Sequence, residues 1–169
     1  MNTIHYLKVN DFHIAEGKKG KVLCTNLKGV SFVMFYSKEC IYCNELFPIF
    51  KQLSQQIPSC AFAALNISND PGVVYASQKT IAKIDSVPYL VLYVQGRPFV
   101  RYTGSKKFED IGNFIVEILK RVQNKKNFMD VNTKYENIEV IERISGSIPF
   151  NLECFNGDCY LKFSELYKK

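Results

Sequence analysis

Two cysteines three positions apart, Cys40 and Cys43, stand where an apolar run gives way to an amphipathic stretch. The run 30–36 predicts a buried strand, and the apolar residues that follow Cys43 recur at helical spacing. Two thiols placed in this way at the start of a helix lie on one turn, close enough to form a disulfide. The first thiol also faces the helix N-terminus, whose unpaired N–H groups favour a thiolate, the species that attacks disulfides. The sequence therefore predicts a redox dithiol at a strand-to-helix junction.

Length and hydropathy allow one ordinary domain with an extension. The chain has 169 residues, and its 47% hydrophobic fraction is enough for a packed core. No apolar run approaches the roughly 20 residues that cross a bilayer. Residues 1–8 lack the charged leader and apolar stretch of a secretory signal. We therefore expect a cytoplasmic protein without a membrane partner.

The formal net charge of +6 comes mostly from lysines that are scattered along the chain. A groove for nucleic acid would more typically gather arginines and interleaved aromatic residues on one face. We therefore expect a solvated basic surface and no nucleic-acid partner.

Most of the six cysteines would stay reduced in a cytoplasmic protein, so paired cysteines need a reason. Cys24 and Cys60 stand alone beside apolar residues, and we expect each to be a buried small hydrophobe. Cys40 and Cys43 could instead supply half of a zinc site, but the remaining pair is spaced differently and lies far away in the sequence. We therefore expect no metal and no cofactor.

Cys154 and Cys159 form a second pair around Asn156-Gly157, the strongest two-residue hairpin signal. With that turn, Cys154 lies opposite Cys159 at a non-hydrogen-bonded position, where side chains are close enough for a cross-strand disulfide. Three interpretations stay open: a structural or labile disulfide, two free thiols, or a relay that passes electrons to the first pair.

Strand and helix patterns alternate through the middle of the chain. They predict the order strand, helix, strand, helix, strand, strand, helix, which gives an α/β fold with a central mixed β-sheet and helices on both faces. Asp70 is expected to be the N-cap of the second helix, and Gln95-Gly96 the turn between the last two strands. The segments are 30–36, 40–57, 60–67, 70–84, 89–94, 98–102 and 105–122, preceded by strand pieces at 4–9 and 22–25.

The charged and polar residues 124–127 predict a linker. We therefore divide the chain into a main domain, residues 1–123, and a C-terminal extension, residues 124–169, that contains the second cysteine pair. The extension is too short to fold on a core of its own, so we expect it to pack against the main domain.

The motifs, taken in order, resemble those of the thioredoxin superfamily, which includes thioredoxins and protein disulfide isomerases. Residues 35–43 are similar to the active-site segment of that family, Pro48 to its helix-kinking proline, and Val87-Pro88 to its cis-proline segment. The resemblance covers residues 22–122. The tail, residues 147–163, is similar to extensions on thioredoxin-like proteins of large DNA viruses. In a viral protein, the expected location is the host cytoplasm or the virion.

The resemblance implies a thioredoxin fold and protein-disulfide oxidoreductase activity, with protein disulfides or dithiols as substrates and an upstream redox partner. It implies that Cys40 attacks the substrate disulfide and that Cys43 resolves the mixed disulfide. The residues expected to hold an extended substrate segment are Tyr36, Ile41, Tyr42, Val87 and Pro88.

The chain departs from the family pattern behind the dithiol. Met34 replaces a buried aspartate and Ala64 replaces its lysine partner, two groups that help to deprotonate the resolving thiol. Glu39 replaces the tryptophan before the first cysteine. Between the cysteines there is no histidine to stabilise a thiolate, so we expect a reducing or intermediate potential. An alternative is a redox-silent thioredoxin-like module with a binding or structural role, such as a virion component.

Overall fold

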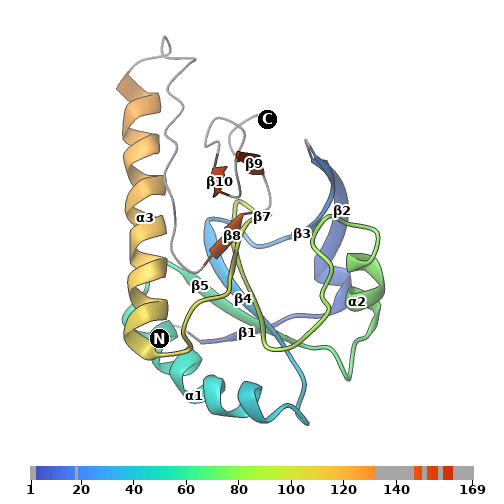
Figure 1. The fold of residues 1–169 in the computed structure, drawn as a ribbon. Helices are drawn as coiled ribbons and strands as arrows, with labels where there is room; N and C mark the ends of the chain where they lie inside the picture. Colours follow the sequence, from blue (N-terminus) through green and yellow to red (C-terminus); the bar gives the residue numbers. More distant parts are fainter. Residues whose placement is uncertain (1–2, 18, 132–146, 150–151, 156–157, 162–169) are drawn as a thin grey trace.

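A computed structural model describes residues 3–17, 19–131, 147–149, 152–155 and 158–161. Its centre is a six-stranded mixed sheet with the strand order β1-β5-β4-β6-β7-β8 (Figure 1). The central strand β4 pairs in parallel with β5 and antiparallel with β6. The expected mixed sheet is therefore confirmed. Its strands are β1 (His5–Tyr6), β4 (Val30–Tyr36), β5 (Ala61–Asn66), β6 (Tyr89–Val94), β7 (Arg97–Tyr102) and β8 (Ser147–Pro149).

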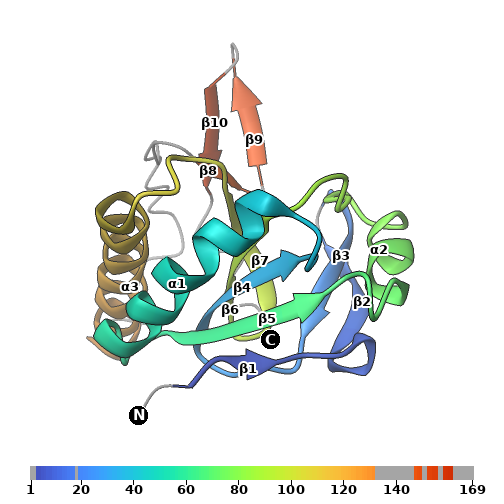
Figure 2. The same cartoon turned by 90° about the horizontal axis from the view of Figure 1, so that it is seen from below.

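One face of the sheet is covered by α1 (Ile41–Gln56) and α3 (Phe108–Val131), which Figure 2 shows on the same side. The core beneath these helices is rich in aromatic rings. Phe50 of α1 has no exposed surface, and its ring centroid lies 5.8 Å from that of Phe32 and 5.1 Å from that of Phe62. The amphipathic pattern after Cys43 is thus explained by burial against the strands.

The other face is covered by α2 (Gly72–Ser77) and by an antiparallel pair of strands, β2 (Phe12–Gly17) and β3 (Gly20–Thr25) (Figure 2). A short 3-10 helix, Val9–Asp11, leads into β2. A second hydrophobic core lies on this face of the sheet. Phe12 of β2 belongs to it and packs against Phe35, with ring centroids 5.5 Å apart. The sequence pattern did not predict β2, because only Phe12 of this strand is buried and its other side chains lie toward solvent or are half-buried.

The β6–β7 hairpin turns at Gln95-Gly96, as the sequence predicts. Both residues have a positive φ, of 52° and 77°, a conformation that favours glycine. A Cβ atom at Gly96 would also clash with the carbonyl oxygen of Thr25, whose N–H donates to the Gly96 carbonyl at 2.8 Å. The turn therefore joins the main sheet to β3.

The second helix is shorter than the sequence pattern suggests, because α2 ends at Ser77 and not at Ile84. The buried Ser77 hydroxyl donates to the Val74 carbonyl at 2.7 Å and accepts the Ile84 N–H at 3.0 Å. The Ser77 side chain thus links the end of α2 to the returning chain at Ile84. The prediction of Asp70 as the N-cap is also wrong, because its carboxylate accepts the Val9 N–H at 2.6 Å.

The predicted linker at 124–127 is wrong, because α3 continues through it to Val131. The stretch has no proline or glycine, and its polar residues are compatible with an exposed helix. Among the described residues no helix has the length and apolar content to cross a bilayer. Beyond α3, strand β8 pairs antiparallel with β7, with Ile148 opposite Arg101, so the extension contributes an edge strand to the main sheet. The division at residue 123 stays a prediction.

We expect Phe50→Ala to lower the free energy of unfolding by about 3–5 kcal/mol, because it removes a fully buried ring and leaves a cavity. Urea unfolding followed by circular dichroism measures this loss. Val116→Ala is the matched control, because Val116 is 38% exposed on α3, and its change should stay within about 0.5 kcal/mol. A loss below about 1 kcal/mol for Phe50→Ala would contradict the packing described for α1.

Candidate active site

Cys40 lies at the N-terminus of α1, directly after the turn that follows β4. Its backbone N–H donates to the Ser37 carbonyl at 3.2 Å, which closes the turn. As the N-cap of α1, its sulfur accepts the Cys43 N–H at 3.1 Å. Helix N-termini leave backbone N–H groups without partners, and here the Cys40 sulfur satisfies one of them. The same hydrogen bond stabilises negative charge on that sulfur.

The two thiols have different environments. Cys40 is half-buried, whereas Cys43 has no exposed surface. Burial raises the pKa of the Cys43 thiol to about 12, and the hydrogen bond with the Cys40 side chain acts in the same direction. Cys40 is therefore the thiol that a large substrate can reach, and Cys43 is held protonated behind it.

The Val87–Pro88 segment lies directly against Cys40 although it is far away in the sequence. The Cys40 thiol donates to the Val87 carbonyl with a sulfur–oxygen distance of 3.7 Å. The Val87–Pro88 peptide bond is cis. The antiparallel register of β4 and β6 explains the proximity, because Phe35, at the end of β4, is opposite Tyr89, which follows Pro88.

The three aromatic or aliphatic residues predicted to bind substrate are placed differently. Ile41 and Tyr42 are 70% and 72% exposed beside Cys40, so they offer an accessible apolar surface. Tyr36 is half-buried and packs edge-on against Phe47 of α1, with ring centroids 5.2 Å apart. Burial raises the pKa of the Tyr36 hydroxyl. Tyr36 therefore packs against α1, and the exposed apolar surface is formed by Ile41 and Tyr42.

Met34 and Ala64 lie opposite each other on β4 and β5, and both are fully buried. They belong to the core beneath α1 and α3. Because both side chains are apolar, neither can accept the proton of Cys43.

A carboxylate and two hydroxyl groups join the turn before Cys40 to the loop after β5. The Glu39 carboxylate accepts hydrogen bonds from the hydroxyl groups of Ser37 and, at 3.1 Å, Ser68. The hydrogen bond from the Ser37 hydroxyl is the largest cause that lowers the pKa of the Glu39 carboxyl, and the bond from Ser68 acts in the same direction. The carboxyl group therefore stays ionised. This network was not predicted from the sequence. A signal was present, since Ser37 and Ser68 each follow a strand, and the carboxyl ends of neighbouring parallel strands meet at one edge of a sheet.

The remaining cysteines do not join the site. Cys24 and Cys60 are buried, as expected, and burial raises the pKa of Cys60 to about 12. In the extension, β9 (Leu152–Phe155) pairs antiparallel with β10 (Asp158–Leu161), and Cys154 is opposite Cys159.

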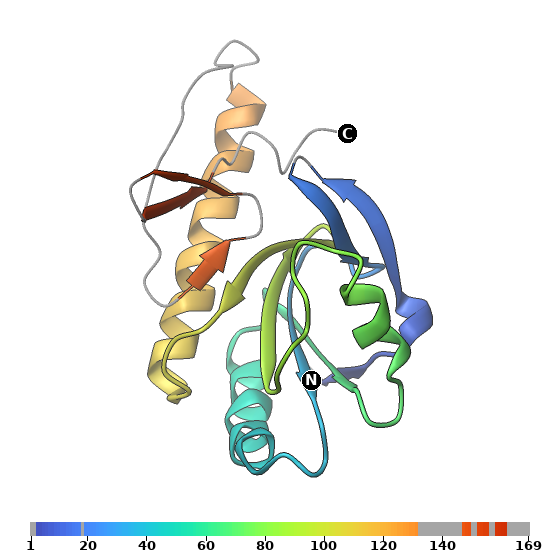
Figure 3. The same cartoon turned by 45° about the vertical axis from the view of Figure 1, so that its right-hand side comes forward.

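The predicted turn of the second pair, residues 156–157, lies outside the described residues, and so do the side chains of both strands. Figures 1 and 3 show β9 and β10 far from the start of α1. The three interpretations of this pair therefore remain predictions.

Comparisons with known proteins agree with this fold. The protein-family model for thioredoxin matches residues 21–117. The chain is 36% identical over 88 residues to protein 196R of Invertebrate iridescent virus 6, a match that covers 52% of this chain and 51% of that relative. It is 28% identical over 89 residues to the thioredoxin of Chlamydia pneumoniae, covering 52% of this chain and 80% of that one. The chain thus spans about half the length of the viral relative.

A crystal structure of human ERp44 has the same fold. It superposes with a TM-score of 0.54 and 19% identity, covering 69% of this chain and 29% of that one. At this identity the likeness concerns the fold alone. Since the thioredoxin family model matches more than half of the chain and the sheet agrees with it, the protein belongs to the thioredoxin family.

Proposed function

We propose that the protein is a thiol–disulfide oxidoreductase that exchanges disulfides with protein substrates through Cys40 and Cys43. The observation that carries this proposal is the position of the Cys40 sulfur, which accepts the Cys43 N–H at 3.1 Å and contacts the Val87 carbonyl at 3.7 Å. A half-buried thiol at a helix N-terminus, with a second thiol one turn away, is the arrangement that disulfide exchange needs.

In the reducing direction, the Cys40 thiolate attacks one sulfur of a substrate disulfide. A bond forms between Cys40 and that sulfur, and the other substrate sulfur leaves as a thiolate that takes up a proton. Cys43 then loses its proton and attacks the Cys40 sulfur, which releases the second substrate thiol and leaves a Cys40–Cys43 disulfide. Two electrons pass to the substrate. An upstream dithiol partner must return them, and the reverse sequence oxidises a substrate dithiol.

Ionisation of Cys40 also prepares the Val87 carbonyl for the substrate. The neutral thiol donates a hydrogen bond to this oxygen, whereas a thiolate has no proton to donate. The carbonyl is then free to accept an N–H from an extended substrate segment, a strand-addition contact. The exposed Ile41 and Tyr42 flank the approach and provide apolar contact area.

Resolution by Cys43 is the difficult step. Burial holds its pKa at about 12, and the apolar Met34 and Ala64 supply no base. Its proton must therefore pass to water or to a group of the substrate. These same residues favour the second candidate function, a redox-silent module that binds a partner without turnover. We place either function in the host cytoplasm, which keeps thiols reduced, or in the virion, if the chain is viral like its relative 196R.

Cys40→Ser should reduce the rate of insulin-disulfide reduction, with dithiothreitol as the electron source, to that of dithiothreitol alone. The nucleophile is then a hydroxyl, which does not attack a disulfide. Cys43→Ser should retain the first attack and accumulate a mixed disulfide that mass spectrometry detects. Wild-type protein that never exceeds the dithiothreitol rate would instead support the redox-silent module.

The resolution step should accelerate with pH by about tenfold for each pH unit between about pH 7 and about pH 9, without a plateau. A thiol reacts as its thiolate, and over this range that fraction rises tenfold per unit because the pKa of Cys43 lies far above it. An aromatic disulfide reagent with a coloured thiolate separates two phases: Cys40 attack releases the first thiolate, and Cys43 attack releases the second.

This measurement uses a background in which Cys154 and Cys159 are serine, since Cys24 and Cys60 are already buried. Adding Cys43→Ser should abolish only the second phase. A second phase whose rate is independent of pH would show that Cys43 has a proton acceptor, contrary to the role assigned to Met34 and Ala64.

A further inference from the structure

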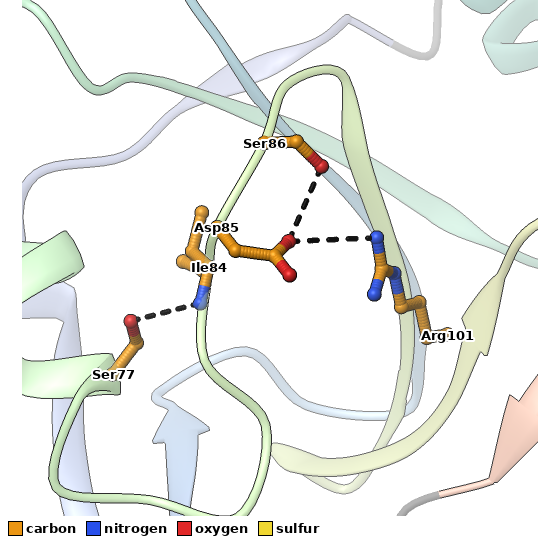
Figure 4. A network of polar contacts seen from close by, with 5 residues as sticks. All are labelled: Ser77, Ile84, Asp85, Ser86 and Arg101. Atoms are coloured by element: carbon orange, nitrogen blue, oxygen red, sulfur yellow. Dashed lines mark hydrogen bonds and ion pairs between the residues drawn. The ribbon is translucent and has the colours of Figure 1, made fainter.

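The chain between α2 and β6 carries Val87 and Pro88 to the dithiol, and Figure 4 shows the polar contacts of its last part. The buried Ser77 hydroxyl, at the end of α2, accepts the N–H of Ile84, the residue before Asp85, at 3.0 Å. Near its end, the Asp85 carboxylate accepts the Ser86 hydroxyl at 3.2 Å and lies 3.9 Å from the guanidinium of Arg101. Figure 4 shows Arg101 reaching this carboxylate from the neighbouring strand.

Arg101 contacts the chain on both sides of Val87 and Pro88. Its guanidinium carbon lies 4.1 Å from the centroid of the Tyr89 ring, a cation–π contact with the residue that follows Pro88. The same guanidinium faces Asp85, two residues before Val87. One side chain therefore fixes both ends of the segment whose carbonyl contacts the Cys40 thiol.

The backbone of Arg101 is a rigid support for these contacts. It lies on β7, opposite Val91 of β6 on one side and Ile148 of β8 on the other. Its side chain is 25% exposed, so the contact with Tyr89 is partly shielded from water, whereas Asp85 is 69% exposed and its ion pair is screened. The stacking on Tyr89 is therefore the stronger of the two contacts. The planar guanidinium of Arg101 can stack on the Tyr89 ring and face the Asp85 carboxylate at the same time, which the ammonium group of a lysine cannot do.

We propose that Arg101 is a positioning residue for substrate binding, because it holds the Val87 carbonyl in place to accept an extended protein segment. Arg101 does not touch the sulfurs, so its loss should weaken substrate binding and leave the chemistry of Cys40 unchanged. This inference rests on the proposed function.

The test compares Arg101→Met with wild-type protein in insulin reduction. We expect KM to rise about fivefold, equivalent to about 1 kcal/mol, and kcat to stay within about twofold. The rate at which iodoacetamide alkylates Cys40, followed by peptide mass spectrometry, should not change. Arg101→Lys should recover only part of the KM, because lysine keeps the charge but loses the planar stacking. Asp85→Asn should raise KM less than Arg101→Met does.

Arg97→Met is the matched control. Arg97 lies on the same strand, but its guanidinium donates to the Glu16 carbonyl at 2.9 Å, on the β2–β3 side of the molecule. Its KM should equal that of the wild type. An unchanged KM in Arg101→Met, or a parallel fall of kcat and Cys40 alkylation, would overturn the positioning role while leaving the proposed function intact. Wild-type protein that reduces no insulin would overturn the proposed function itself.

Discussion

The antiparallel pairing of β4 with β6 is the constraint on which the candidate site depends. It sets Phe35, at the end of β4, opposite Tyr89, so the chain that leaves β4 toward Cys40 meets the chain that enters β6 from Val87 and Pro88. The parallel pairing of β4 with β5 adds the loop that carries Ser68 at the same edge. A slip of one residue would send the side chains of β4 to the opposite faces and move Cys40 away from the Val87 carbonyl.

The arrangement separates two demands on the two thiols. In the proposed disulfide exchange, Cys40 attacks as a thiolate and must be accessible, and the N-terminus of α1 provides the Cys43 N–H as a hydrogen-bond donor to its sulfur. Cys43 must stay unreactive until the mixed disulfide has formed, and burial keeps its thiol protonated. The second demand conflicts with resolution, because the same burial disfavours the thiolate that must form. Met34 and Ala64 are apolar and buried in the core, so they supply no base, and under the proposed function this favours slow release of the mixed disulfide.

The sequence predicted those parts of the fold in which local pattern and burial agree. Residues 30–36 and the helical residues after Cys43 bury most of their apolar side chains in the two cores, so the sequence period indicated the type of each element directly. It failed at the end of α2, where the chain turns back and the Ser77 hydroxyl accepts the Ile84 N–H, a contact that no periodicity encodes. At the polar end of α3 the predicted linker was wrong, because the helix continues through it. A charged stretch without proline or glycine does not by itself indicate a linker.

The site follows the same division. Cys40 and Cys43 were predictable because their spacing and helix start are local properties of the chain. Arg101 was not, because its contacts with Asp85 and Tyr89 exist only once β7 lies beside β6. Under the proposed function, the motif specifies which atoms react, whereas pairing between distant strands specifies how the substrate is held. If Arg101 has the positioning role proposed above, substitutions there change the affinity for substrates while the dithiol stays the same.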